Sequence, residues 1–246
     1  MIKIIKSEFY KTKHTWLPWI HIIIPVAYAF LFFLAAKTTG LKNSTDRDIM
    51  QNYFVILGAA FPIVIGAITS KIADMEREAG NFQVILSSTE SRKSAYFGKL
   101  LYLLLGEIFS LIIAVYMFRF LFGYGTFTEW TVGLLLVFAG NIAVYAVHLF
   151  VSIKFNGSAS IGLGFVETML AMLCMTGLGD RIWYFIPGAW SARLTATYVI
   201  GSKLMDKILF YNEMTKFCII AVPMAIVILA ASVIWFEKWD GKSSND

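Results

Sequence analysis

The stretch that decides the fold is "WLPWIHIIIPVAYAFLFFLAA", residues Trp16 to Ala36, which contains no Asp, Glu, Lys or Arg. About 20 mostly apolar residues are enough to cross the roughly 30 Å hydrocarbon core of a membrane as a helix. The apolar residues follow one another without alternation, which is typical of a membrane helix and not of a barrel strand. This stretch therefore predicts a first transmembrane helix.

Five further stretches have the same character, and the whole chain of 246 residues is 58% hydrophobic and 15% charged. An ordinary soluble domain is about half apolar and a quarter charged. We therefore predict an all-α integral membrane protein that forms one domain, residues 1–246, with six transmembrane helices. The five further spans are Tyr53–Ala73, Leu100–Phe122, Trp130–Ser152, Ala159–Leu178 and Phe217–Phe236.

The distribution of basic residues predicts the orientation. Six spans place both termini on one side, and Lys3, Lys6, Lys11 and Lys13 all precede the first span. Because cytoplasmic segments carry an excess of Lys and Arg, we expect both the N- and the C-terminus in the cytoplasm.

The N-terminal segment, residues 1–15, has the pattern of an amphipathic helix. Ile2, Ile5, Phe9 and Thr12 recur at steps of three and four, and the lysines fall on other faces. Such a helix lies in the membrane interface, with its apolar face in lipid and its lysines toward anionic headgroups. The alternative is a frayed tail whose lysines only set the topology.

The segment between the second and third spans is longer than a simple connection requires. It reads "ADMEREAGNFQVILSSTESRK", Ala73 to Lys93, and within it Met75, Ala79, Phe82 and Leu86 form one helical stripe. We predict a short cytoplasmic helix over 74–88 whose stripe binds in a groove on another protein. The alternative is a solvated linker in which the stripe is accidental.

Residues typical of helix starts and helix breaks also occur in this predicted helix. Asp74 can serve as its N-cap, and Glu76 and Glu78 follow in the first turn, where the helix dipole favours acidic side chains. Gly80 either interrupts the helix or marks the bend between the second span and a separate short helix.

Glu107, His148 and Glu167 are ionisable residues that fall inside predicted spans. A charge at the centre of a membrane costs about 2.5 kcal/mol or more, so such groups normally face the bundle interior or a wet path. They are candidates for a substrate path. The alternative is an internal partner, such as Asn141 or a histidine, without a role in transport.

The connection between the fifth and sixth spans, residues 179–214, is rich in aromatic side chains. Trp183, Tyr184 and Trp190 are the residue types expected at a membrane interface. They could contact a membrane-bound substrate, or they could anchor helices that re-enter the outer leaflet.

Signals for catalysis, metal binding and nucleic-acid binding are missing. The chain has no GxxxxGK[ST] loop for nucleotide phosphates and no HExxH, and its three histidines are isolated. No basic run with interleaved aromatic residues appears, so nucleic acid is not an expected partner. We therefore expect no catalytic residue, no metal and no enzyme activity in this chain.

The segment "EREAGNFQVILSSTESRKSAYFGK", Glu76 to Lys99, resembles the one between the second and third spans of ABC-2 type transporter permeases. The resemblance implies a coupling helix seated in a cleft of a separate ATPase subunit. The residues implied in this coupling are Asp74, Met75, Glu76, Arg77, Glu78, Gly80, Phe82 and Leu86.

A second motif, "WYFIPGAW" from Trp183, is similar to the family's aromatic-Pro-aromatic stretch. In the family this stretch belongs to two short re-entrant outer helices between spans five and six. Gly188 stands where many relatives have an aromatic residue, so a contact role does not carry over to that position.

The opening "IKIIKSEFYKTKHTW" is similar to the start of permeases of lantibiotic-immunity and peptide-antibiotic resistance exporters. This resemblance implies a bacterial cytoplasmic membrane protein that pairs with a second permease as a heterodimer and with two ATPase copies. ATP and Mg would be bound by the ATPase and no cofactor by this chain. Export of lantibiotic-type antimicrobial peptides from the membrane lipid is the implied function. Export of a lipid, polysaccharide or drug, and peptide sensing by a membrane scaffold without transport, are the alternatives.

Overall fold

The computed structural model describes residues 2–80, 82–87, 91–203 and 207–241, and no strand is found among them. The helices are α1 (Ile2–Thr12), α2 (Leu17–Thr38), α3 (Asp46–Glu78), α4 (Gln83–Leu86), α5 (Arg92–Phe122), α6 (Phe127–Lys154), α7 (Gly157–Leu173), α8 (Pro187–Lys203), α9 (Lys207–Lys216) and α10 (Val222–Lys238). Short 3-10 turns lie at η1 (Gly40–Asn43), η2 (Gly177–Gly179) and η3 (Trp183–Phe185), and a π turn, η4, at Phe217–Ala221.

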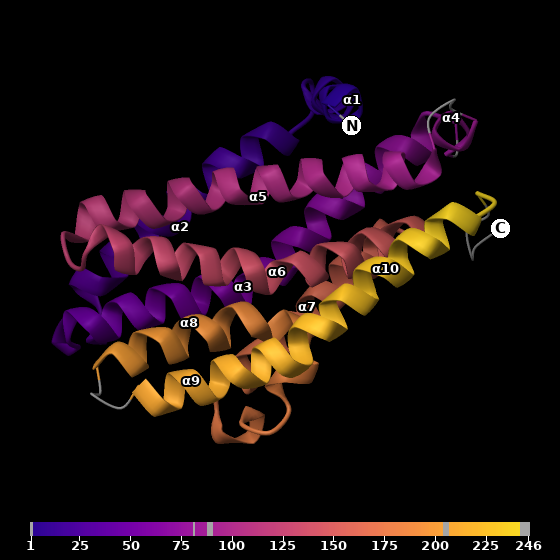
Figure 1. Cartoon of the computed structure of the whole chain (residues 1–246). Coiled ribbons are helices and arrows are strands. Elements are labelled where there is room, and N and C mark those ends of the chain that lie inside the picture. The colour runs from indigo at the N-terminus through magenta and orange to yellow at the C-terminus, as the bar shows by residue number, and fades with distance from the viewer. Residues whose placement is uncertain (1, 81, 88–90, 204–206, 242–246) are drawn as a thin grey trace.

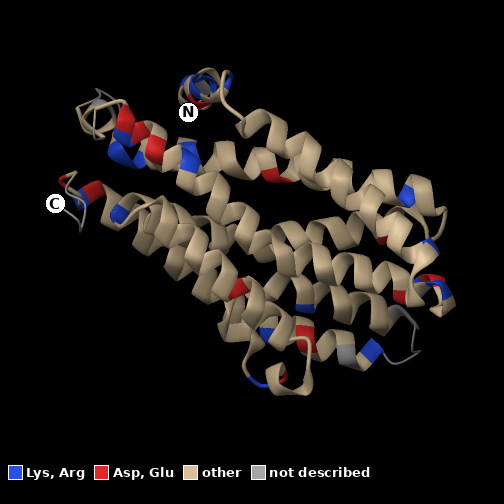
Figure 2. Ribbon diagram, turned by 180° about the vertical axis from the view of Figure 1, so that it is seen from behind, with Lys and Arg blue, Asp and Glu red and all other residues tan. Residues whose placement is uncertain are grey.

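Five helices within the described ranges are long and apolar enough to cross a membrane. Four of them are α2, α3, α5 and α6, and the fifth is the continuous helix Phe210–Lys238 that joins α9 through η4 to α10. The chain is therefore an all-helical, multi-pass membrane protein, as predicted. Lys, Arg, Asp and Glu gather mainly toward the two ends of the bundle (Figure 2), which leaves most of its middle apolar.

The predicted fifth span differs from the expectation. It corresponds to α7, which has 17 residues and at 1.5 Å per residue is about 25 Å long, less than the hydrocarbon core. A loop follows, and then α8 packs against α3, α6 and α7. Crossing by six spans, and re-entry of α8 and α9 into the outer leaflet, stay predictions.

The two ends of the bundle are built differently. One end, here called the α4 end, carries α4 and the C-terminal end of α10, and the hairpin of α8 and α9 lies toward the opposite end (Figure 1). In this view α1 is seen nearly end-on while α5 runs along the page, so α1 lies across the bundle (Figure 1). That orientation fits a helix in the membrane interface.

The turn between α5 and α6 follows from local sequence. Gly123 ends α5 in the left-handed conformation, with φ 76°. Thr126 then caps α6 by accepting a hydrogen bond from the backbone N–H of Glu129, whose carboxylate accepts one in return from the N–H of Thr126. Such a short connection makes the two helices antiparallel neighbours.

The long C-terminal helix contains an irregular turn. In η4 the backbone N–H of Val222 donates to the carbonyl of Phe217, five residues back. Pro223 follows in the first turn of α10 and has no N–H to continue the ordinary helical ladder. The Phe217 ring meets Trp190 of α8 edge-on, with ring centroids 5.7 Å apart.

Helix α8 lies deep in the bundle because its neighbours offer small residues. Its own Ala189, Ser191 and Ala192 are fully buried. A Cβ atom at Gly140 of α6 would lie 2.6 Å from the backbone nitrogen of Ser191. Gly140 thus lets the backbones of α6 and α8 approach more closely than any other residue would allow.

We expect Gly140→Ala to destabilise the fold by about 1–3 kcal/mol, because the new methyl group overlaps backbone that cannot move aside easily. The measurement is the thermal unfolding midpoint of the purified protein in detergent. Gly162→Ala in α7 is the matched control, since no atom lies within 4 Å of its Cβ position. The control should be neutral or stabilised by up to about 1 kcal/mol. Equal midpoints for the two variants would contradict this account of α8 packing.

Candidate functional site

The segment predicted as one helix over 74–88 has a different structure. Helix α3 continues without a break through Glu78, so Asp74 lies inside it and does not cap a new helix. Gly80 (φ 116°) and Phe82 (φ 66°) then reverse the chain into the single turn of α4. Residues 81 and 88 lie outside the described part. Of the two interpretations of Gly80, the structure matches the bend.

A buried ion-pair cluster holds the end of α3 in place. Lys99 of α5 is 3% exposed, and its Nζ lies 2.8 Å from Glu76 Oε1 and 2.6 Å from Glu8 Oε2 of α1. Lys11 Nζ reaches the same two carboxylates, at 2.7 Å from Glu76 and 3.1 Å from Glu8. The cluster joins α1, α3 and α5, and it makes Glu76 an internal residue, where the sequence suggested a contact surface.

Phe82 is also internal. Its ring is 2% exposed and meets Trp239 edge-on, with centroids 5.0 Å apart. The Arg77 guanidinium lies 5.5 Å from the Phe82 ring centroid, donates to Asp74 Oδ1 at 2.8 Å and to the Ser152 carbonyl at 3.3 Å. These contacts fix the turn against α6 and the C-terminal end of α10.

The predicted stripe is therefore not one exposed face. Met75 and Leu86 are half-buried and pack against the core, whereas Ala79 is exposed. A small exposed surface remains around the turn, and we call it the α4 tip. It consists of Glu78, Ala79, Gly80, Gln83 and Ser87.

The ionisable residues inside the bundle have internal partners. His148 Nε2 of α6 lies 3.0 Å from Glu167 Oε2 of α7, and His148 Nδ1 lies 2.8 Å from Ser160 Oγ. Ser160 also contacts Thr69 Oγ1 of α3 at 3.0 Å. A Cβ at Gly188 would lie 2.8 Å from Glu167 Cβ, so this glycine lets α8 begin directly over the glutamate.

Glu107 belongs to a second polar group. Its Oε1 accepts from Asn141 Nδ2 at 2.7 Å, and Ser191 Oγ of α8 donates to Asn141 Oδ1 at 2.5 Å. Glu107 Oε2 and the Tyr145 hydroxyl are buried without a hydrogen-bond partner among the described residues. Each group thus links long helices to α7 or α8, which is the internal pairing given as the alternative to a path.

The outer aromatic residues are mostly inside the fold. Trp183 and Trp190 are fully buried, where the sequence suggested an interface. Trp183 Nε1 donates to Glu213 Oε2 at 2.7 Å, and Trp190 Nε1 donates to the Tyr184 carbonyl at 3.1 Å. Tyr184 itself is half-buried.

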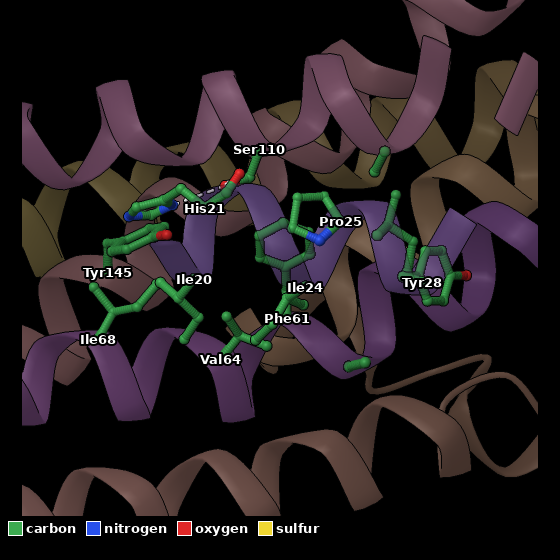
Figure 3. Close-up of a pocket in the computed structure, with 13 residues that line it drawn as sticks. Ile20, His21, Ile24, Pro25, Tyr28, Phe61, Val64, Ile68, Ser110 and Tyr145 are labelled. Carbon is green, nitrogen blue, oxygen red and sulfur yellow. Dashed lines mark hydrogen bonds between the residues drawn. The ribbon is translucent and has the colours of Figure 1, made fainter. Parts of the chain in front are cut away.

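A small cavity lies between α2, α3, α5 and α6 (Figure 3). Its volume is about 70 Å³, and its walls are almost entirely apolar apart from His21, Ser110 and the tyrosines Tyr28 and Tyr145. His21 Nδ1 and Ser110 Oγ are 2.8 Å apart. None of the candidate path residues lines this cavity. The described residues also contain no group of three or more His, Cys, Asp or Glu placed to hold a metal ion.

Comparison with known families now decides the class of the protein. A family model described as "ABC-2 family transporter protein" matches residues 4–179, well over half of the chain. The chain belongs to the ABC-2 transporter family. No curated protein and no solved structure matches it.

Membership gives the general role of the chain. An ABC-2 permease is the membrane component of a transporter and generally works with an ABC ATPase, so the chain is not expected to be an enzyme itself. The matched residues include most of α1, the ion-pair cluster, the α4 tip, the Glu167–His148 group, and the Glu107–Asn141 pair of the second polar group. The outer segment from residue 180 onward lies outside the match.

Sequence reasoning missed three members of the ion-pair cluster: Glu8, Lys99, and Lys11, which was expected to face lipid headgroups. Glu8 and the buried Thr12 lie one turn apart on the face of α1 that packs against α5. The available signals were an acidic residue among the lysines of the N-terminal amphipathic helix and a lysine directly before the third predicted span.

Removing one charge from the cluster should be costly in this ABC-2 permease. We expect Lys99→Met to destabilise it by about 3–5 kcal/mol, because Glu8 and Glu76 would lose their buried counterion. Lys93→Met is the control: Lys93 lies in the same helix and pairs with Glu237 at 3.1 Å, but both side chains are about half exposed. An exposed pair is worth about 0–1 kcal/mol. Thermal unfolding in detergent should separate the two variants, and similar midpoints would argue against the cluster as an anchor.

Proposed function

We propose that this ABC-2 permease is driven by a separate ATPase that binds the α4 tip. The observation that carries the proposal is the α4 tip itself, an exposed turn held rigidly at the end of α3. The sequence of this turn resembles the family's coupling segment, and the chain has no phosphate-binding loop of its own. Two ATPase copies would bind ATP and Mg.

The contacts beneath the tip suggest how movement would pass into the membrane. Phe82 and Arg77 fasten the turn to α6 and α10, and Glu76 fastens α3 to α1 and α5. Helix α3 has 33 residues, about 50 Å at 1.5 Å per residue, and packs along α6, α7 and α8. A displacement of the tip would therefore move the bundle as a nearly rigid body, as in a two-state change biased by nucleotide.

The proposed substrate is a lantibiotic-type antimicrobial peptide, taken from the membrane of a bacterial cell and released outside, which gives immunity. The opening sequence supports this choice because it resembles permeases of that kind. A second permease would complete the transporter as a heterodimer. Among the candidate path residues we retain Glu167 with His148, since Glu167 is 7% exposed whereas Glu107 is fully buried.

Placing a bulky charge on the α4 tip tests the ATPase site. We expect Ala79→Arg to reduce the amount of cognate ATPase that co-purifies with the permease, and peptide resistance with it, because Ala79 is exposed at the centre of the tip. Thr128→Arg is the control, an equally exposed change in the first turn of α6, near the opposite end of the bundle. Phe82→Asp would be a poorer test, because it buries a charge. Unchanged co-purification and resistance in Ala79→Arg would refute the proposed site.

The path hypothesis requires the charge of Glu167, whereas internal pairing requires only a hydrogen bond. Glutamine at this position can still bond to His148, so Glu167→Gln should keep the protein level normal. We expect it to lower resistance to the peptide, measured as the inhibitory concentration. Glu237→Gln at the exposed end of α10 serves as the control for loss of one acidic group. Normal resistance in Glu167→Gln would leave Glu167 with a purely structural role.

A further inference from the structure

A long apolar groove lies in the corner between α1, α2 and α5. Its volume is about 480 Å³, within the range of about 300–1,000 Å³ typical of ligand sites. The apolar walls come from Phe9 of α1, Ile22 of α2, and Tyr102, Leu105 and Phe109 of α5, and Lys13 lies at the α1 side. The groove thus has one basic end and an apolar length.

The groove is preformed by contacts within the chain. Gly106 has no side chain, and a Cβ there would lie 2.8 Å from the His21 ring, so the ring forms a floor against α5. His21 is held in turn by Ser110. The Thr12 and Tyr102 hydroxyls are 2.7 Å apart and brace the wall where α1 crosses α5. A site that needs no rearrangement loses little free energy to ordering when it binds.

The basic end is free to meet an anion. Lys13 is exposed and makes no hydrogen bond or ion pair with the part of the chain that the structure describes. Its neighbour Lys11 is committed to Glu8 and Glu76. Because α1 has the character of an interface helix, Lys13 would lie at the level of lipid headgroups.

The apolar part of the groove extends along α5, away from the level of the lipid headgroups. Tyr102, Leu105 and Phe109 follow one face of α5 over seven residues, about 10 Å along the helix. Leu105 is 41% exposed, Phe109 48% and Ile22 41%. An anionic head at one end and an aliphatic chain along the other match the polarity of an amphiphile.

We propose that this groove binds one anionic glycerophospholipid from the leaflet on which α1 lies. Its phosphate contacts Lys13, and one acyl chain lies along Ile22, Leu105 and Phe109. A bound lipid fills the corner beside α1, and through the Glu8 and Lys11 pairs it steadies the cluster that holds α3. The site does not depend on the identity of the transported substrate.

Native mass spectrometry of the full-length permease tests the headgroup contact. The detergent-solubilised protein is mixed with equal amounts of phosphatidylglycerol and phosphatidylcholine, and the bound lipids are counted. We expect one phosphatidylglycerol to be retained preferentially. A basic residue contributes about 1 kcal/mol to binding an anionic lipid surface, so Lys13→Gln should lower this retention about fivefold. Lys3→Gln removes an exposed charge from α1, outside the groove, and should leave retention unchanged.

A second pair of variants tests the acyl-chain contact. Ile22→Trp fills the groove, whereas Ile23→Trp enlarges an exposed neighbour that does not line it. Only Ile22→Trp should reduce lipid retention. The proposal would be overturned if both lipids were retained to the same extent or if no lipid were retained. It would also be overturned if the matched variants had equal effects. Loss of a permease dimer in Ile22→Trp with unchanged lipid binding would overturn it too, and would identify the groove as an interface between copies.

Discussion

The burial of Lys99 is the constraint on which the α4 end of the molecule depends. An ammonium group in an apolar interior is tolerated only when its charge is compensated by partners close at hand. Here the compensation comes from two helices, because Glu8 lies on α1 and Glu76 on α3. The crossing of α1 over the bundle and the position of the last turn of α3 are therefore set together. The same ion pairs hold the end of α3 that carries the α4 tip.

The acidic side chains in the interior of the bundle are also compensated by nearby partners, here a histidine and an asparagine. Glu167 faces His148, and Glu107 faces Asn141, so neither acidic side chain is presented to lipid. Both polar groups extend to the interrupted region of α7 and α8, through Ser160 and Ser191. Helix α7 is short, and the regular helical hydrogen bonding ends after it, where the short turns η2 and η3 follow. Polar side chains at this place give the incomplete span specific partners that apolar packing alone does not supply.

The sequence predicted the long helices well because a continuous apolar run has few other uses. For Glu107 and Glu167 it left two interpretations open, a substrate path or an internal partner such as Asn141 or a histidine, and the structure places Asn141 beside Glu107 and His148 beside Glu167. The reversal after Glu78 was not predictable from periodicity: Met75, Ala79, Phe82 and Leu86 share a helical stripe, yet Phe82 turns inward to meet Trp239, which is far away in the chain. Trp183 and Trp190 of the outer segment were expected at the membrane interface, but contacts with residues distant in the chain bury them. Trp183 is buried because Glu213 offers a partner for its N–H group.

The π turn at η4 has a consequence for how one helix serves two sets of neighbours. Helix α9 packs against α8, whereas α10 packs against α5 and α6. One additional residue in a turn rotates every later side chain by about 100° around the helix axis. The same continuous rod can thus present one stripe to the outer hairpin and a different stripe to the long helices. Deleting a single residue between Phe217 and Ala221 would put the two halves into a common phase and turn one of these stripes away from its neighbour.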